Sequence, residues 1–112
     1  MEDKLTILWT NADILTSEHM VFMYAKASLS HGFWKKVEII IWGATAKLVA
    51  ENLDIQKKLL EVESCGVKVR GCIACAKALD VEDTLRGIGL ELLPMGQPLT
   101  DILKTDGKLI TI

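Results

Sequence analysis

The sequence lacks several features that would assign it to common functional classes. Its 112 residues carry a formal net charge of −2 and show no basic patch, which argues against nucleic acid as a ligand. No apolar run is long enough for a membrane-spanning helix, and the first segment, MEDKLTILWTNAD, has early acidic residues and only a short apolar run, unlike a secretory signal. We therefore expect a cytoplasmic protein without a membrane span, in a compartment where thiols stay reduced.

Nucleotide-binding and serine-hydrolase motifs are also missing. Neither a P-loop nor a G-x-G-x-x-G stretch follows the first apolar segment, and the glycines of GIGLELLPMG lack the spacing of that fingerprint. No serine-centred nucleophile elbow is present. The three cysteines and two histidines include no second C-x-x-C and no paired histidines, so they match a four-ligand structural zinc site poorly.

What is present is the composition of a globular domain, with 50% apolar and 25% charged residues. A chain of this length can bury enough surface to fold without disulfide bonds. The sequence has no internal repeat, low-complexity segment or linker. We therefore expect a single domain over residues 1–112.

Short runs rich in valine and isoleucine alternate with segments of helical spacing along the whole chain. The runs predict strands at residues 5–10, 37–42, 67–72, 90–93 and 108–112. The run VEIIIW at 37–42 is apolar almost throughout, as expected of a central strand that is covered on both sides. The alternation predicts an α/β fold with a mainly parallel sheet and helices on both faces.

The first helical segments have recognisable start and stop signals. Thr16 or Ser17 is expected to cap the first helix, and Gly32 is expected to end it. Apolar residues at helical spacing in this helix are Met20, Met23, Tyr24 and Ala27. In the second helical region, 45–66, Thr45 and Asp54 are expected to cap two consecutive pieces, with an apolar stripe at Ile55, Leu59 and Val62 and a stop at Gly66.

Three more helical stretches are predicted towards the end of the chain. One begins around Cys75, and Asp80 is expected to cap a short helix that follows it through Arg86. The last covers residues 99–104 and is closed by Gly107.

The stretch RGCIACAKALDVED, residues 70–83, carries the clearest chemical signal. Cys72 falls at the carboxyl end of the third predicted strand, where ligands gather in open parallel sheets. Cys75 follows about one helical turn later, on the same face if the helix has begun. The positive end of the helix dipole and its free N–H groups favour the reactive thiolate. A strand, a C-x-x-C pair and a helix in this order therefore form a setting for nucleophilic sulfur.

A structural interpretation of the cysteines stands beside this one. Cysteine is among the most buried residue types, so GCIACAKAL also fits a packing surface of small residues. Cys65 ends a helical segment with no second thiol nearby in sequence, and we expect a structural role for it.

Histidine and tryptophan residues give further candidates. His31 is expected on the surface, whereas His19, near the start of the first helix, is either exposed or a neighbour of Cys72. Trp9 and Trp42 end the first two strands at the same edge of the sheet, where each either packs or lines a pocket.

Three segments together resemble a known family. TILWTNAD, VEIIIWGATAKLV and GVKVRGCIACAKALDVEDTLRGIGLEL are similar to the DsrE/DsrF-like sulfur-relay proteins, related to the TusD-type carriers. The resemblance covers nearly the whole chain and implies a three-layer sandwich with a five-stranded sheet. It also implies that Cys72 is the sulfur-carrying cysteine and that Cys75 corresponds to the second cysteine of the C-x-x-C members.

The resemblance implies a cytoplasmic, sulfurtransferase-like carrier that needs no cofactor. Cys72 would attack a donor persulfide, hold the outer sulfur and pass it to a partner thiol, while Cys75 would resolve the persulfide or tune the pKa of Cys72. Implied partners are sulfur donor and acceptor proteins or small thiols, in a homotrimer or homohexamer. Two alternatives stay open: a non-enzymatic oligomeric binding module with structural or metal-ligating thiols, and a C-x-x-C thiol–disulfide redox protein.

Overall fold

The strands of the protein run in one direction, so their carboxyl ends meet at one edge of the sheet. The computed structural model describes residues 2–112, which contain one five-stranded sheet with the order β4-β3-β2-β1-β5 and parallel pairing throughout. The strands are β1 (Lys4–Trp9), β2 (Lys36–Ile41), β3 (Lys68–Cys72), β4 (Glu91–Leu93) and β5 (Lys108–Thr111). The α/β class and the parallel sheet that the sequence predicts are confirmed.

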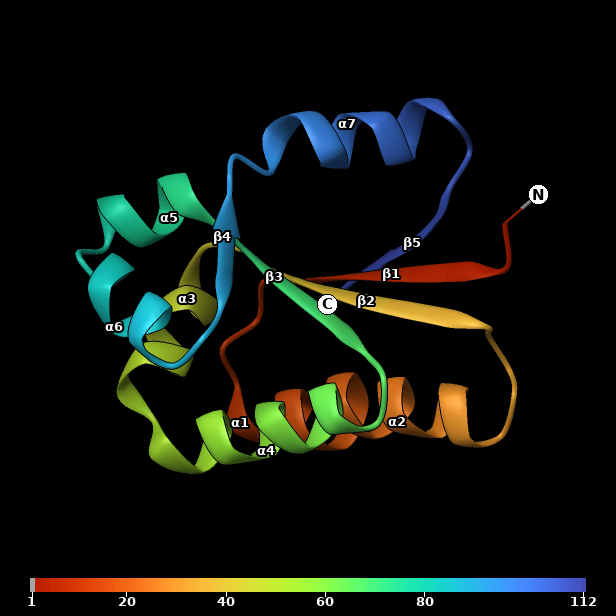
Figure 1. Cartoon of the computed structure of the whole chain (residues 1–112), viewed down its shortest axis with the longest axis horizontal. Coiled ribbons are helices and arrows are strands. Elements are labelled where there is room, and N and C mark those ends of the chain that lie inside the picture. Colours follow the sequence, from red (N-terminus) through yellow and green to blue (C-terminus); the bar gives the residue numbers. More distant parts are fainter. Residues whose placement is uncertain (1) are drawn as a thin grey trace.

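Helices cover both faces of this sheet and its carboxyl edge. They are α1 (Ile14–Thr16), the π-helical segment η1 (Ser17–Phe22), α2 (Met23–Ser30), α3 (Ala44–Glu51), α4 (Leu53–Ser64), α5 (Ile73–Ala78), α6 (Glu82–Gly87) and α7 (Gly96–Lys104). Figure 1 shows α1, α2 and α4 below the sheet, α7 above it, and α3, α5 and α6 beyond the carboxyl ends of the strands. The arrangement is that of a three-layer sandwich. None of the helices in residues 2–112 is long and apolar enough to cross a membrane.

Alternation along the strands separates two different faces of the sheet. Leu5, Ile7 and Trp9 of β1 are buried in the main apolar core. The intervening positions point to the other face, towards α7, because successive side chains of a strand point to opposite sides. That face is apolar near the carboxyl edge, where Ile40 and Cys72 pack together, and polar further back.

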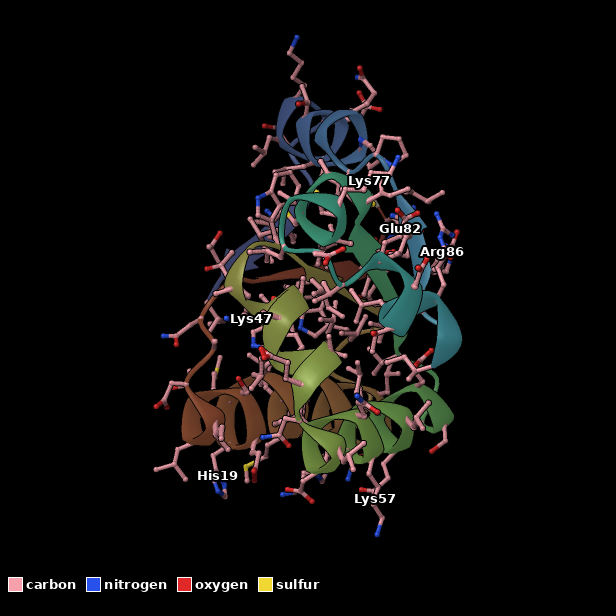
Figure 2. The ribbon with its side chains drawn as sticks, turned by 90° about the vertical axis from the view of Figure 1, so that its left-hand side faces the viewer. His19, Lys47, Lys57, Lys77, Glu82 and Arg86 are labelled. Atoms are coloured by element: carbon pink, nitrogen blue, oxygen red, sulfur yellow. The ribbon has the colours of Figure 1, made fainter. Side chains whose placement is uncertain are left out.

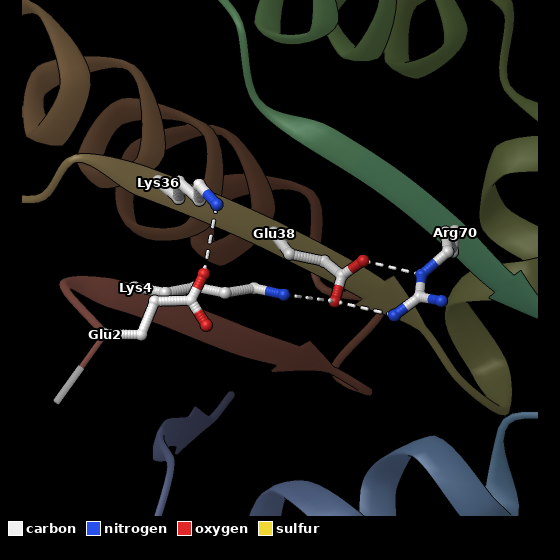
Figure 3. A network of polar contacts seen from close by, with 5 residues as sticks. All are labelled: Glu2, Lys4, Lys36, Glu38 and Arg70. Atoms are coloured by element: carbon white, nitrogen blue, oxygen red, sulfur yellow. Dashed lines mark hydrogen bonds and ion pairs between the residues drawn. The ribbon is translucent and has the colours of Figure 1, made fainter.

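The polar part of this face is organised by a buried carboxylate. Glu38 of β2 accepts two hydrogen bonds from Arg70 of β3, at 2.6 Å from Nε and 2.9 Å from Nη2. Lys4 Nζ lies 3.5 Å from the same carboxylate, and a separate exposed pair joins Lys36 to Glu2. Figure 3 shows the Glu38 carboxylate between Arg70 and Lys4. The pairing satisfies a charge that would otherwise be costly to bury.

The first helix begins earlier than the sequence predicts, so the expected cap at Thr16 or Ser17 is wrong. Asp13 is the N-cap: its carboxylate accepts the Thr16 backbone N–H at 2.9 Å. Ser17 is instead buried, where its hydroxyl donates to the Asp13 carbonyl at 2.7 Å and accepts the indole N–H of Trp9 at 3.1 Å. The Ser17 hydroxyl is therefore used by the Trp9 indole and the Asp13 carbonyl and does not cap the helix.

The apolar stripe predicted for this helix is also displaced. Met20 and Met23 are 38% and 54% exposed, whereas Val21, Phe22 and Ala25 are buried. The reason is the π-helical segment η1, whose wider turn holds more residues than an α-helical turn and so shifts the inward face. The stop at Gly32 is confirmed, because this residue follows the helix with a φ of +68°.

The second helical region divides as predicted but with a different cap. Asn52 separates α3 from α4 and its side chain accepts the Ile55 N–H at 3.0 Å, so Asp54 is not the cap. The cap expected at Thr45 is also wrong: Gly43 is the N-cap of α3, and Thr45 is buried inside the helix with its hydroxyl donated to the Trp9 carbonyl at 2.7 Å. The predicted stripe Ile55, Leu59 and Val62 is buried, as expected.

Boundaries near the end of the chain differ by a few residues. Helix α5 begins at Ile73, with Cys72 in the N-cap position, and α7 begins at Gly96. Asp80 does not cap α6, because Val81 takes that position. Asp80 has a φ of +58° and lies in the left-handed turn that ends α5, a conformation that aspartate tolerates better than most residues.

Candidate thiol site

Cys72 lies where β3 meets α5, at the carboxyl edge of the sheet. Cys72 is only 5% exposed and packs with Ile40 and Met95 in a small apolar cluster. Trp42 and Leu93 border the same cluster. The preceding residue leaves no room for a larger side chain, because a Cβ on Gly71 would lie 2.8 Å from a methyl group of Leu92. The absence of a side chain at Gly71 therefore lets Leu92 of β4 pack closely against β3 directly before Cys72.

Cys75 is the third residue of α5 and is half-buried. Its pKa is raised above the ordinary value, first by burial and then by a hydrogen bond with Cys72 and the negative charge that Cys72 carries when ionised. The backbone of Gly43 and the residue's own backbone lie close enough to oppose this shift in pKa. The two predicted thiols thus lie together, and the raised pKa makes Cys75 harder to ionise, which is contrary to the thiolate-favouring setting expected from the sequence.

Gly43 is not among the site residues predicted from the sequence, although it reaches the thiol pair. It follows β2 after the single residue Trp42 and forms the N-cap of α3, with a φ of +67° that strongly favours glycine. This turn brings its backbone beside Cys75. The sequence does contain a sign of this role, since Gly43 follows the predicted central strand at the same edge of the sheet as Cys72.

A cavity of about 760 Å³ opens beside Cys75. Its walls come from the loop before α1, from the turn and helix α3, and from α5; the lining residues are Ala12, Gly43, Ala44, Lys47, Leu48, Glu51, Asn52, Cys75, Ala78 and Leu79. Cys72 is not among them. Figure 2 looks at this end of the molecule and shows Lys47 on α3 facing the viewer. The cavity therefore gives one thiol of the pair, Cys75, a face that a ligand can reach.

Of the two positions left open for His19, the exposed one is confirmed and the approach to Cys72 is wrong. His19 is exposed and borders a different hollow between η1, α2 and α4, together with residues such as Lys58 and Glu61. In Figure 2 it lies at the bottom of the view, whereas Lys77 of α5 lies in the upper half. The chain turns below the sheet after β1, and this carries the histidine away from the thiols.

The remaining single residues divide between surface and core. His31 is exposed, as expected, and stacks on Phe33 with ring centroids 5.4 Å apart. Cys65 is exposed at the C-cap of α4. It ends the helix, as expected, but its side chain is not buried in the core. Trp9 is fully buried and meets Phe22 edge-on at 5.1 Å, which confirms packing for this residue.

The arrangement supports thiol chemistry more readily than metal binding within one chain. Among residues 2–112, no three His, Cys, Asp or Glu side chains come together in a way that could hold a metal ion. The site instead offers two thiols in contact, one beside a cavity and one buried in an apolar cluster. Such a pair can exchange sulfur atoms or electrons with a thiol ligand.

Comparison with known proteins finds a solved structure that is similar to this chain over nearly its whole length. The solved structure of a conserved protein of unknown function, BT1422 from Bacteroides thetaiotaomicron, superposes with a TM-score of 0.94 and 39% sequence identity. The match covers 98% of this chain and 95% of that one. No protein-family model and no curated protein matches the sequence.

Proposed function

The chain belongs to the same family as BT1422, and for this member we propose a function as a sulfur carrier of the DsrE/DsrF-like, TusD-type kind. It holds sulfur as a cysteine persulfide and passes it to a partner thiol. The observation that supports this most directly is the division of the thiol pair: Cys75 lines an open cavity, and Cys72 lies buried in contact with it.

The division suggests an order of action for the two thiols. In the first step the Cys75 thiol gives up its proton and, as the thiolate, attacks the outer sulfur of a donor persulfide, R–S–SH, in the cavity. The donor S–S bond breaks, a new S–S bond forms on Cys75, and R–S⁻ leaves and takes up a proton. In the second step Cys72 attacks the outer sulfur on Cys75, and the Cys75 thiolate is released. Neither step changes the overall oxidation state, so no cofactor is needed.

This order assigns the cysteines complementary roles. The resemblance implies that Cys72 itself attacks the donor, whereas its 5% exposure favours Cys75 as the thiol that meets the donor first. Burial of the Cys72 persulfide among Ile40 and Met95 would protect it from water and oxidants. Release is the reverse relay, from Cys72 through Cys75 to an acceptor thiol. Small thiols or donor and acceptor proteins in the cytoplasm are the proposed partners, and a homotrimer or homohexamer is the proposed assembly.

Intact mass spectrometry tests the proposal directly. The reduced protein is incubated with a low-molecular-weight persulfide above neutral pH, where more of the Cys75 thiol is ionised, and a gain of about 32 Da, one sulfur atom, is expected. Cys75→Ser should load slowly because the buried thiol is left without its relay. Cys72→Ser should load at Cys75 and then lose the sulfur quickly to added thiol.

Cys65→Ser is the matched control, because Cys65 is exposed and lies outside the cavity. It should load and hold sulfur like the wild type. Sulfur loading that persists in the Cys72→Ser/Cys75→Ser double variant but disappears in Cys65→Ser would refute the proposal.

The contact between the thiols also favours a second candidate, a thiol–disulfide redox protein. In that case incubation with the donor or with a disulfide reagent would lower the mass by about 2 Da as Cys72 and Cys75 close a disulfide bond. The same spectrum therefore separates the two functions.

A further inference from the structure

We infer that the cavity beside Cys75 binds a small, neutral, apolar organic thiol and its persulfide, and that it disfavours charged thiols. The inference rests on the proposed function, since it names the substrate class of the same site. It is drawn from the walls of the cavity and not from the cysteines alone.

The size of the cavity suits a small organic molecule. Its volume of about 760 Å³ falls within the range of roughly 300–1,000 Å³ that small-molecule sites usually have. Three separate parts of the chain meet there: the loop before α1 at Ala12, the start of α3 at Ala44, and the end of α5 at Ala78. Small alanine side chains from these parts leave the space open, and Leu48 and Leu79 add larger apolar surfaces.

The two charged groups of the lining form an ion pair with each other, and the side-chain oxygen of Asn52 is used at the start of α4. Lys47 and Glu51 form an ion pair at 3.8 Å on the surface of α3, with side chains 63% and 56% exposed. The amide oxygen of Asn52 accepts the Ile55 N–H at 3.0 Å. The charges of the lining residues thus cancel. A carboxylate or ammonium group placed against the alanines would lose hydration without gaining a partner, which is unfavourable.

The Cys75 thiol determines which chemical group the apolar ligand carries. Cys75 reaches the cavity from the first turn of α5, and its sulfur can exchange with a thiol, a disulfide or a persulfide bound beside it. An apolar body in the cavity with a sulfur at one end satisfies both the walls and the thiol. A small charged thiol can react with Cys75 but does not match the apolar walls of the cavity.

Labelling rates at individual cysteines test this inference. The reduced protein reacts with three methanethiosulfonate probes that carry a neutral butyl, an anionic sulfonatoethyl or a cationic trimethylammonioethyl group, and peptide mass mapping gives the rate at each cysteine. Cys65 reports the intrinsic reactivity of each probe, because it is exposed and outside the cavity. Relative to Cys65, Cys75 should prefer the butyl probe over both charged probes by about tenfold, the gain from burying roughly two methylene groups.

Matched substitutions locate the preference in the cavity. Leu79→Asp places a charge in the lining at a residue that is 40% exposed, and it should remove most of the preference for the butyl probe. Leu60→Asp, at a residue that is 54% exposed and outside the lining, should leave it unchanged. If Leu79→Asp does not fold, Ala44→Asp provides the same test, because an acidic residue is favourable in the first turn of a helix.

Failure of this inference is distinguishable from failure of the proposed function. The apolar ligand would be ruled out if Cys75 and Cys65 had the same probe preference. It would also be ruled out if Leu79→Asp and Ala44→Asp left the preference of Cys75 intact. Sulfur loading from inorganic polysulfide needs no apolar body and is measured on the same proteins. If loading succeeds while the preference is absent, the carrier function stands and the ligand class is wrong. If the preference is present without loading, the apolar site stands and the carrier function is wrong.

Discussion

Replacing Arg70 with alanine should be one of the most damaging changes to the stability of this fold. Arg70 holds Glu38 through two hydrogen bonds of 2.6 and 2.9 Å, and the Glu38 side chain is only 1% exposed. Removing one partner of a buried pair usually costs about 3–5 kcal/mol because the other charge stays buried. Lys4, at 3.5 Å, still faces the carboxylate, so we expect the lower end of that range, about 3 kcal/mol.

Thermal and urea unfolding give the measurement. For a chain of this size, each kcal/mol corresponds to about 4 °C in Tm, so Arg70→Ala should lower Tm by roughly 12 °C. The matched control is Arg86→Ala, whose pair with Glu82 at 3.1 Å is much more exposed, at 48% and 29%. That change should cost no more than about 0.5 kcal/mol.

A second variant separates the lost hydrogen bonds from the stranded charge. Glu38→Leu combined with Arg70→Met removes both charges and keeps apolar volume in the sheet. Its stability should return to within about 2 kcal/mol of the wild type, since apolar replacements of buried pairs are often tolerated. An Arg70→Ala cost as small as that of Arg86→Ala would refute the reasoning, as would a double variant less stable than Arg70→Ala.

Three further predictions concern the thiol pair and its surroundings. Because burial and Cys72 raise the pKa of Cys75, its iodoacetamide labelling should keep accelerating above neutral pH. In Cys72→Ala the midpoint should move to lower pH and the rate at pH 7 should rise; a slower rate would contradict the assigned cause. Gly71→Ala places a Cβ 2.8 Å from Leu92 and should destabilise the protein by about 1–3 kcal/mol in urea unfolding, and an unchanged midpoint would show that the leucine moves freely. Asn52→Ala removes the cap of α4 and should cost about 1 kcal/mol, whereas Asn52→Asp, which can still cap, should cost clearly less.

Local patterns predicted the strands and the fold class well. Residues 37–41 of the run VEIIIW lie in β2 and are all buried, because a strand covered on both faces buries successive residues. The stripe through Ile55, Leu59 and Val62 identified the inward face of α4 for a similar reason. In both places the spacing of apolar residues is consistent over a whole element, so the local sequence is enough to predict its structure.

Local patterns failed where a polar side chain had two possible partners. Ser17 and Thr45 are good helix caps in isolation, yet both hydroxyls bond to groups in or near Trp9 in the core. The π-helical segment that follows then moved the apolar face from Met20 and Met23 to Val21 and Phe22. Competition between a nearby and a distant partner depends on tertiary packing, which the sequence around each residue does not contain.

The sequence by itself determined the α/β alternation, the carboxyl-edge position of Cys72 and the one-turn spacing of Cys75, because these depend on strand and helix periodicity. Only the tertiary structure decided that Cys72 is buried, that Cys75 faces a cavity and that His19 lies elsewhere. It also brought Gly43 and α3 beside the thiols, because the parallel neighbours β2 and β3 end at the same edge of the sheet although a crossover connection separates them in sequence. Exposure and proximity at this edge arise from how α3 and α5 pack beyond the ends of β2 and β3, and that packing is a property of the whole sheet.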